Sequence, residues 1–183
     1  MRIVFFLLDT VFFFLVGAAL LRAWMNHQRI SMVGQPGQLV MAVTQWMVAP
    51  VRRILPKPLA QSRMDWGSLM AAVLFALAYG GLWLILAATL TPVQASPAAV
   101  LLAIPTLGIK LLLRTLLQGL MMMLLAYAVL SWVQPHSPVL GLLDRLCAPV
   151  LRPVRRFVPL VGGVDVSVLV LIIVLQVGLM VLG

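Results

Sequence analysis

The chain has 183 residues, of which 63% are hydrophobic and 9% are charged, and its formal net charge is +9. A soluble domain carries roughly a quarter charged residues, so this composition excludes a soluble protein and predicts an all-α integral membrane protein. In a soluble protein, such an excess of basic residues would indicate nucleic-acid binding, but here the basic residues flank hydrophobic runs. There they orient membrane spans and contact anionic headgroups. We therefore expect a lipid bilayer as the partner of these charges, and no nucleic acid.

About four hydrophobic runs are predicted to cross the membrane, because about 20 apolar helical residues span its hydrocarbon core. They lie at residues 3–21, 67–90, about 111–132, and 164–182. The segment 98–108, interrupted by Pro105 and Gly108, is interpreted as a short apolar piece that dips into the bilayer or lies on it. A fifth, broken span is the alternative.

Two connections between these runs contain amphipathic segments. In residues 36–48 the apolar side chains recur at helical spacing over a length too short to span, which indicates an interfacial helix. The connection at 134–163 contains a second such helix, with Ser137 predicted as its N-cap and Pro138 as its first residue.

The two connections share a motif. Pro50, Arg52, Arg53 and Pro56 correspond at one constant offset to a second set: Pro153, Arg155, Arg156 and Pro159. In both sets an aspartate follows, immediately before the next hydrophobic run. The chain is therefore predicted to be two tandem repeats, 1–95 and 96–183, each with a span, an amphipathic segment and a span.

This order of parts resembles the YggT family (also called YlmG) of small integral membrane proteins. Its signature is a proline, two arginines, a proline, Gly-Gly and an Asp-Ser pair. The second repeat carries all of it, through Gly162, Gly163 and Asp165, whereas the first keeps Asp65 but lacks Gly-Gly. The resemblance implies a membrane protein without an established reaction. It also implies links to bacterial division, cell shape and osmotic tolerance and, in plastid relatives, to maturation of a b-type cytochrome.

The basic residues also predict an orientation. The connections 26–66 and 134–163 hold five and four of them, and the loop at 91–97 holds none. By the positive-inside rule both basic connections face the cytoplasm and both termini lie outside, in a bacterial inner membrane. Three basic residues do not follow this pattern: Arg2, Lys110 and Arg114.

The paired arginines, fixed between prolines in a predicted short turn, have two interpretations. They are either orientation signals whose side chains snorkel, or a site for lipid phosphate or a partner protein, because guanidinium groups bind phosphate bidentately. Asp65 and Asp165 are predicted to cap the helices that follow, which is compatible with pairing to the adjacent arginines.

Asp9 is different, because an acidic residue inside a span is costly and usually has a partner. We predict an intramembrane ion pair of Asp9 with Arg114 or Lys110. An ion or proton pathway, or an Asp9 that reaches the outer interface alone, are the alternatives.

We expect no catalytic residue, metal or cofactor. His27 and His136 occupy corresponding places in the repeats and could ligate haem, but interfacial histidines need no such role. A lone cysteine, Cys147, permits no internal disulfide and is interpreted as a small apolar residue. The predicted function is a non-enzymatic scaffold or assembly factor with a membrane-protein partner or a second copy. A small channel or osmolyte transporter is the alternative.

Overall fold

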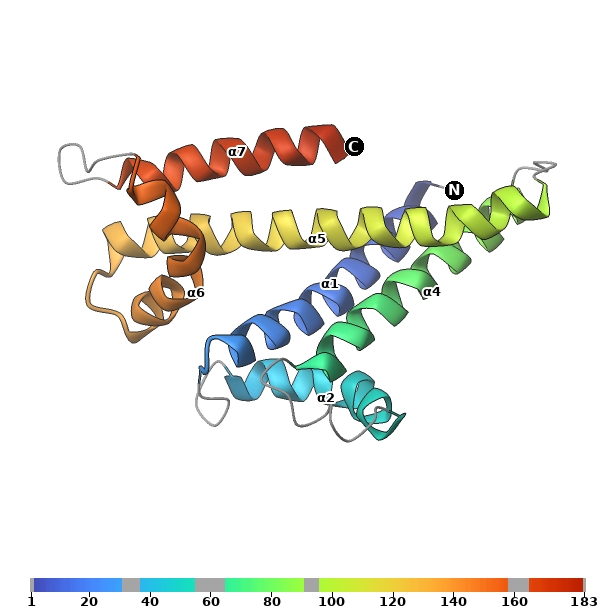
Figure 1. The fold of residues 1–183 in the computed structure, drawn as a ribbon, viewed down its shortest axis with the longest axis horizontal. Coiled ribbons are helices and arrows are strands. Elements are labelled where there is room, and N and C mark those ends of the chain that lie inside the picture. The colour runs from blue at the N-terminus through green and yellow to red at the C-terminus, as the bar shows by residue number, and fades with distance from the viewer. Residues whose placement is uncertain (1, 31–36, 55–64, 91–95, 158–164, 183) are drawn as a thin grey trace. The chain divides into compact units, whose positions relative to one another are not determined.

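The computed structural model describes residues 2–30, 37–54, 65–90, 96–157 and 165–182. These residues form six α-helices and no strand, as the predicted all-α class requires. The helices are α1 (Arg2–His27), α2 (Gly37–Ile54), α4 (Trp66–Leu90), α5 (Pro97–Val133), α6 (Pro138–Arg155) and α7 (Val166–Leu182) (Figure 1).

Three of these helices, α1, α4 and α5, are long and apolar enough to cross a membrane. The predicted fourth span, α7, is equally apolar but has 17 residues, at the lower end of the roughly 17–25 that cross a bilayer core. The composition and these helices identify a membrane protein.

The interpretation of residues 98–108 as a separate segment is wrong, and so is the broken fifth span. Residues 97–133 form one continuous helix, α5, with Pro105 inside it. Proline removes one backbone donor, but transmembrane helices tolerate it where nearby hydroxyls bond the backbone. Here the Thr106 hydroxyl donates to the carbonyls of Leu102 and Ala103, at 3.1 and 2.8 Å. These bonds support the turn next to the carbonyl that Pro105 leaves without its helical donor, that of Leu101, and α5 continues through the proline.

The described residues pack as two compact units, residues 1–115 and 116–183. The division falls within α5, whereas the predicted repeats meet between residues 95 and 96. The repeat boundaries remain a prediction from the sequence, and each packing unit is described by itself below.

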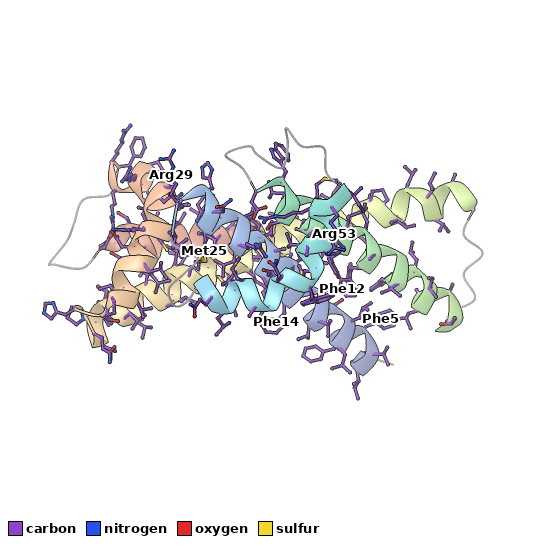
Figure 2. All side chains as sticks on the ribbon, turned by 90° about the horizontal axis from the view of Figure 1, so that it is seen from below. Phe5, Phe12, Phe14, Met25, Arg29 and Arg53 are labelled. Atoms are coloured by element: carbon purple, nitrogen blue, oxygen red, sulfur yellow. The ribbon has the colours of Figure 1, made fainter. Side chains whose placement is uncertain are left out.

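In the first unit α1 packs along α4, and α2 contacts both helices (Figure 1). On α1 the packed face includes Phe12, Val16 and Ala19, which are at most 8% exposed. The opposite face exposes Phe14 by 66% (both phenylalanines are labelled in Figure 2). A helix with large apolar residues on both faces can pack against the protein core with one face and contact lipid with the other.

Glycines bring α4 and α5 together within this unit. A Cβ added to Gly80 would lie 2.5 Å from the carbonyl oxygen of Ile104, and one added to Gly108 would lie 3.0 Å from that of Ala76. Only residues without a side chain allow such backbone proximity. A Cβ added to Gly81, the next residue in the chain, would have no atom within 4 Å.

The core of the second unit joins the later part of α5 to α6 and α7. Its buried residues are Leu124, Cys147, Leu151, Val168, Leu171 and Leu175. The α6 helix starts as predicted, with Pro138 in its first turn and the Ser137 hydroxyl accepting from the N–H of Val139. Burial raises the pKa of the Cys147 thiol to about 11, so the side chain stays neutral and packs as a small apolar residue.

Candidate functional site

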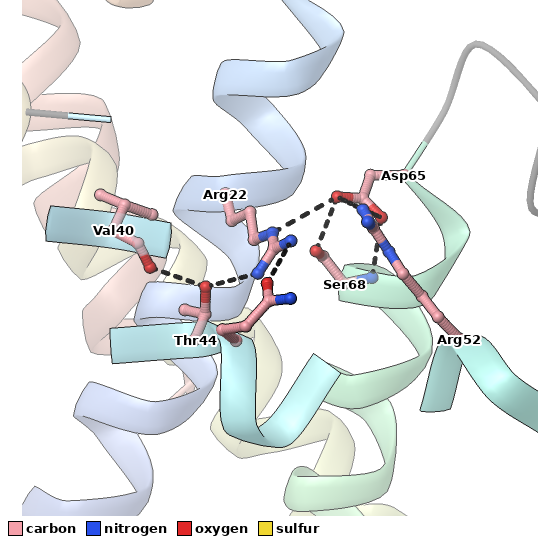
Figure 3. Close-up of polar contacts among 7 residues, drawn as sticks. Arg22, Val40, Thr44, Arg52, Asp65 and Ser68 are labelled. Carbon is pink, nitrogen blue, oxygen red and sulfur yellow. Dashed lines mark hydrogen bonds and ion pairs between the residues drawn. The ribbon is translucent and has the colours of Figure 1, made fainter. Parts of the chain in front are cut away.

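The most extensive polar structure in the described residues is a cluster where α1, α2 and the start of α4 meet. We call Arg22, Thr44, Arg52, Asp65 and Ser68 the first ion-pair cluster (Figure 3). Arg52, in the last turn of α2, approaches both oxygens of the Asp65 carboxylate with its Nη2, at 2.9 Å each. This contact ties the end of the amphipathic helix to the first residue before α4.

Arg22 reaches the same carboxylate from α1. Its side chain is 3% exposed, and its Nε lies 3.7 Å from Oδ2 of Asp65. Its Nη1 donates to the Thr44 hydroxyl at 2.9 Å, and its Nη2 donates to Oε1 of Gln45 at 3.3 Å. One buried guanidinium therefore connects three helices, and Asp65 is the only acidic group paired with it among the described residues.

Asp65 also caps α4. Its Oδ1 accepts from the N–H of Ser68 at 3.2 Å, and its Oδ2 accepts from the Ser68 hydroxyl at 2.8 Å. Burial alone would raise the pKa of this carboxyl, but hydrogen bonds from Arg52 and Ser68 outweigh it, so its pKa lies below the ordinary value. Gly67 leaves room for Arg52, because a Cβ there would lie 2.6 Å from Cγ of that arginine.

A second, smaller arrangement ends α6. We call Tyr127, Arg155, Asp165 and Ser167 the second ion-pair cluster. The Arg155 Nε donates to Oδ2 of Asp165 at 2.8 Å, and its Nη2 lies 3.3 Å from the Tyr127 hydroxyl. Oδ1 of Asp165 accepts from the N–H of Ser167 at 3.1 Å. The Arg155 and Asp165 side chains are 35% and 19% exposed, so this ion pair is more exposed to solvent than the pair of Arg22 and Asp65 in the first cluster.

The two arginines of each pair therefore differ. All four are exposed, but Arg52 and Arg155 bind aspartates within the protein. Within the described residues no hydrogen bond or ion pair involves the side chains of these second arginines (Arg53 is labelled in Figure 2).

The predicted short turn around the arginines is a helix end instead. Pro50 lies inside α2, and Pro153 lies inside α6. Both helices continue through these prolines because the rest of each helix is held by the packing of its apolar face. The other predicted motif residues, Pro56, Pro159, Gly162 and Gly163, lie outside the described residues.

Asp9 has a different partner from those predicted. Its carboxylate accepts a hydrogen bond from the Tyr79 hydroxyl at 2.7 Å. Across the described residues, the ion pairs do not include one between Asp9 and Lys110 or Arg114. Tyr79, 8% exposed, therefore satisfies the acidic group between α1 and α4.

The histidines show no ligand set in this structure. His27 and His136 are both exposed, and the His27 ring stacks near Trp24 at 6.2 Å between centroids. In the described ranges no group of three or more His, Cys, Asp or Glu side chains could hold a metal ion.

Several cluster residues were missed by sequence reasoning. Thr44 had a usable signal, because it shares the helical face of Val40 and Met47 and is the polar member of that buried stripe. Arg22 directly follows a hydrophobic run, a position typical of a charged residue that flanks a span, so the pattern gives no sign of its buried contacts. Tyr127 gave no local signal, since its contact spans 28 residues of chain.

Long apolar helices, two amphipathic helices and an ion-pair cluster at the start of an apolar helix in each unit define a multispanning helical membrane protein. The chain belongs to the CCB3/YggT family, whose model matches residues 1–86 and 106–183. Two relatives of similar length are an uncharacterized protein YggT and a protein encoded in a proC 3′ region.

The YggT relative, from Escherichia coli (strain K12), is 33% identical over 94% of this chain and 85% of its own length. The relative from Vibrio alginolyticus is 34% identical over 93% of this chain and 88% of its own length. An uncharacterized protein of Haemophilus influenzae is 24% identical over 85% of this chain and 78% of its own. No solved structure matches the chain.

Proposed function

We propose that this protein is a non-enzymatic scaffold or assembly factor of the bacterial inner membrane, acting through its amphipathic helices α2 and α6. One observation carries the proposal: each unit ties the end of its amphipathic helix to the start of the next apolar helix through an arginine–aspartate contact. A surface helix held in one position is suited to binding a partner, because little ordering entropy remains to be lost on association.

The state of the carboxylates supports a role without catalysis. Both oxygens of Asp65 bind Arg52 and the Ser68 cap. Asp165 is engaged in the same way by Arg155 and the Ser167 N–H. A carboxylate whose oxygens bind cations and backbone donors is a poor general base, since these contacts stabilise its charged form.

The rival proposal, a channel or osmolyte transporter, would use Asp9 with Lys110 and Arg114. A transport pathway needs polar groups that are available to a solute. The hydrogen bond between Asp9 and Tyr79 occupies the acidic group inside the helix pair, which favours a structural role for it.

Most roles implied by the family resemblance involve other proteins. Division, cell shape and assembly of a cytochrome-type complex each involve a membrane assembly, whereas osmotic tolerance would also fit the transporter. We therefore propose a membrane-protein partner or a second copy of this chain, bound through α2, through α6 or through both.

We further propose that both basic connections face the cytoplasm and that both termini lie outside. Cysteine introduced at position 57 or 145, in a Cys147→Ala background, is expected to resist a membrane-impermeant thiol reagent in intact cells. Cysteine at position 94 is expected to react, because the uncharged loop at 91–97 would face outward. The reverse labelling pattern would overturn this orientation.

The scaffold is tested by site-specific photo-crosslinking in native membranes, read by mass spectrometry. A photoreactive residue replaces Arg145 or Arg152, both exposed on α6. We expect the same partner from both positions. We also expect less of that partner to be captured when Asp165→Asn loosens the end of α6, while membrane insertion stays normal.

The matched control carries the photoreactive residue at Met180, which is 76% exposed on α7, and should capture lipid rather than that partner. Absence of a shared partner, together with solute flux through liposomes that hold the purified chain, would support the transporter instead.

A further inference from the structure

Among the described residues, the second arginine of each pair is followed by a large apolar residue that is exposed. Ile54 follows Arg53 and is 84% exposed, and Phe157 follows Arg156 and is 86% exposed. They are among the most exposed hydrophobic side chains of the described residues. An exposed cation beside an exposed apolar group, at corresponding places in both units, needs a ligand that is charged at one end and apolar at the other.

The ion-pair clusters place these residues at the ends of apolar helices. Arg52, next to Arg53, binds Asp65 immediately before α4 begins, and Arg155, next to Arg156, binds Asp165 immediately before α7. The ends of a spanning helix lie near the headgroup layer. We therefore expect the guanidinium groups of Arg53 and Arg156, which make no hydrogen bond or ion pair within the described residues, to lie at the level of lipid phosphates.

The outer face of α2 supports the same placement. Leu39, Val43 and Trp46 are spaced about one turn apart and are 60%, 45% and 60% exposed, although the other side of α2 is buried against α1 and α4. A helix that is apolar on its packed side and again on its exposed side is suited to lying partly within lipid, with tryptophan at the interface.

We propose that Arg53 and Arg156 each bind the phosphate of an anionic phospholipid, and that Ile54 and Phe157 insert among its acyl chains. Guanidinium groups bind phosphate with two parallel hydrogen bonds. The net charge of +9 favours lipids with a net negative charge over zwitterionic ones. Arg52 and Arg155 are the less available arginines of the two pairs, because aspartates already bind them, Arg52 through its Nη2 alone.

The apolar partners favour lipid over a protein as occupant. Isoleucine and phenylalanine differ in shape, and a packed protein pocket distinguishes such shapes. Acyl chains accommodate either. The inference rests on the proposed function, because it names a ligand for the ends of the amphipathic helices α2 and α6. A lipid-binding assay and partner crosslinking can nevertheless succeed or fail separately.

The test is native mass spectrometry of the purified full chain titrated with phosphatidylglycerol. The double variant Arg53→Gln/Arg156→Gln is expected to weaken binding on the order of tenfold per site, since each loses a charge-assisted hydrogen bond to phosphate. The lysine double variant should fall between wild type and glutamine, because it keeps the charge but loses the planar fork. Ile54→Ser/Phe157→Ser should weaken phosphatidylglycerol binding without changing the charge.

The matched control is Arg29→Gln/Arg145→Gln, which removes the same charge from two other exposed arginines in the same two connections. It is expected to bind phosphatidylglycerol nearly as wild type does. Equal weakening of phosphatidylglycerol binding in this control would show that the effect comes from general surface charge, and it would overturn the proposal.

Full displacement of the lipid by inorganic phosphate, or unchanged binding in the serine variant, would also overturn the proposal, because either result would indicate a site for free anions. Loss of the crosslinked partner in the glutamine variant with lipid binding intact would assign the arginines to a protein.

Discussion

The Asp65→Asn variant is expected to lose about 3–5 kcal/mol of the free energy of unfolding, the range for breaking a buried ion pair. The side chains of Asp65 and Arg22 are each 3% exposed, so the variant leaves the Arg22 guanidinium buried with only Thr44 and Gln45 as partners. Unfolding of the purified chain in detergent micelles measures the loss.

The second cluster provides the control. Asp165→Asn removes the corresponding carboxylate, but the Arg155 and Asp165 side chains are 35% and 19% exposed, and water replaces part of the interaction. We expect a loss of about 1 kcal/mol or less. The double variant Arg22→Met/Asp65→Asn should recover part of the first loss, because it removes the buried cation as well. Equal losses at Asp65 and Asp165 would contradict this account.

Acid should abolish the effect of Asp65→Asn. The pKa of the Asp65 carboxyl is lowered in the folded state, so its stabilisation is complete above the ordinary carboxyl pKa of about 3.9. It declines as the pH falls below that value and through the folded-state pKa. The difference in unfolding free energy between wild type and variant should therefore be constant from neutral pH to about pH 5 and narrow below pH 4.

Gly80→Ala is expected to destabilise the first unit by about 1–3 kcal/mol, the range for overpacking a close contact. The new Cβ would lie 2.5 Å from the Ile104 carbonyl oxygen and 3.3 Å from the Ile104 Cα. These are backbone atoms, so relief requires α4 and α5 to separate rather than a side chain to turn. The same micelle unfolding measurement reports the change.

Gly81→Ala is the matched control, one residue along the same helix. Its Cβ would have nothing within 4 Å, and alanine is the better helix former by roughly 1 kcal/mol. Gly81→Ala should therefore leave stability unchanged or raise it slightly. A loss at Gly81 as large as that at Gly80 would show that the glycines matter for backbone conformation and not for the approach of α5.

The membrane character and the approximate positions of most helices follow from the sequence alone. Runs of apolar residues long enough to cross a bilayer have few other stable forms, since lipid cannot bond exposed backbone groups. Local signals also sufficed for the start of α6, because the Ser137 cap and Pro138 act within one turn. The aspartates at 65 and 165 were recognisable as caps for the same reason: the capping bond reaches two or three residues along the chain.

Tertiary structure decided the rest. α5 continues through Pro105, and its Ile104 and Gly108, on either side of the proline, lie close to the backbone of α4. The partner of Asp9 lies 70 residues away, and that of Arg22 lies on another helix. The two arginines of each pair are adjacent and chemically identical, so no pattern distinguishes them. Adjacent residues on a helix point about 100° apart, and the packing of α2 and α6 determines that the first faces an aspartate and the second faces outward.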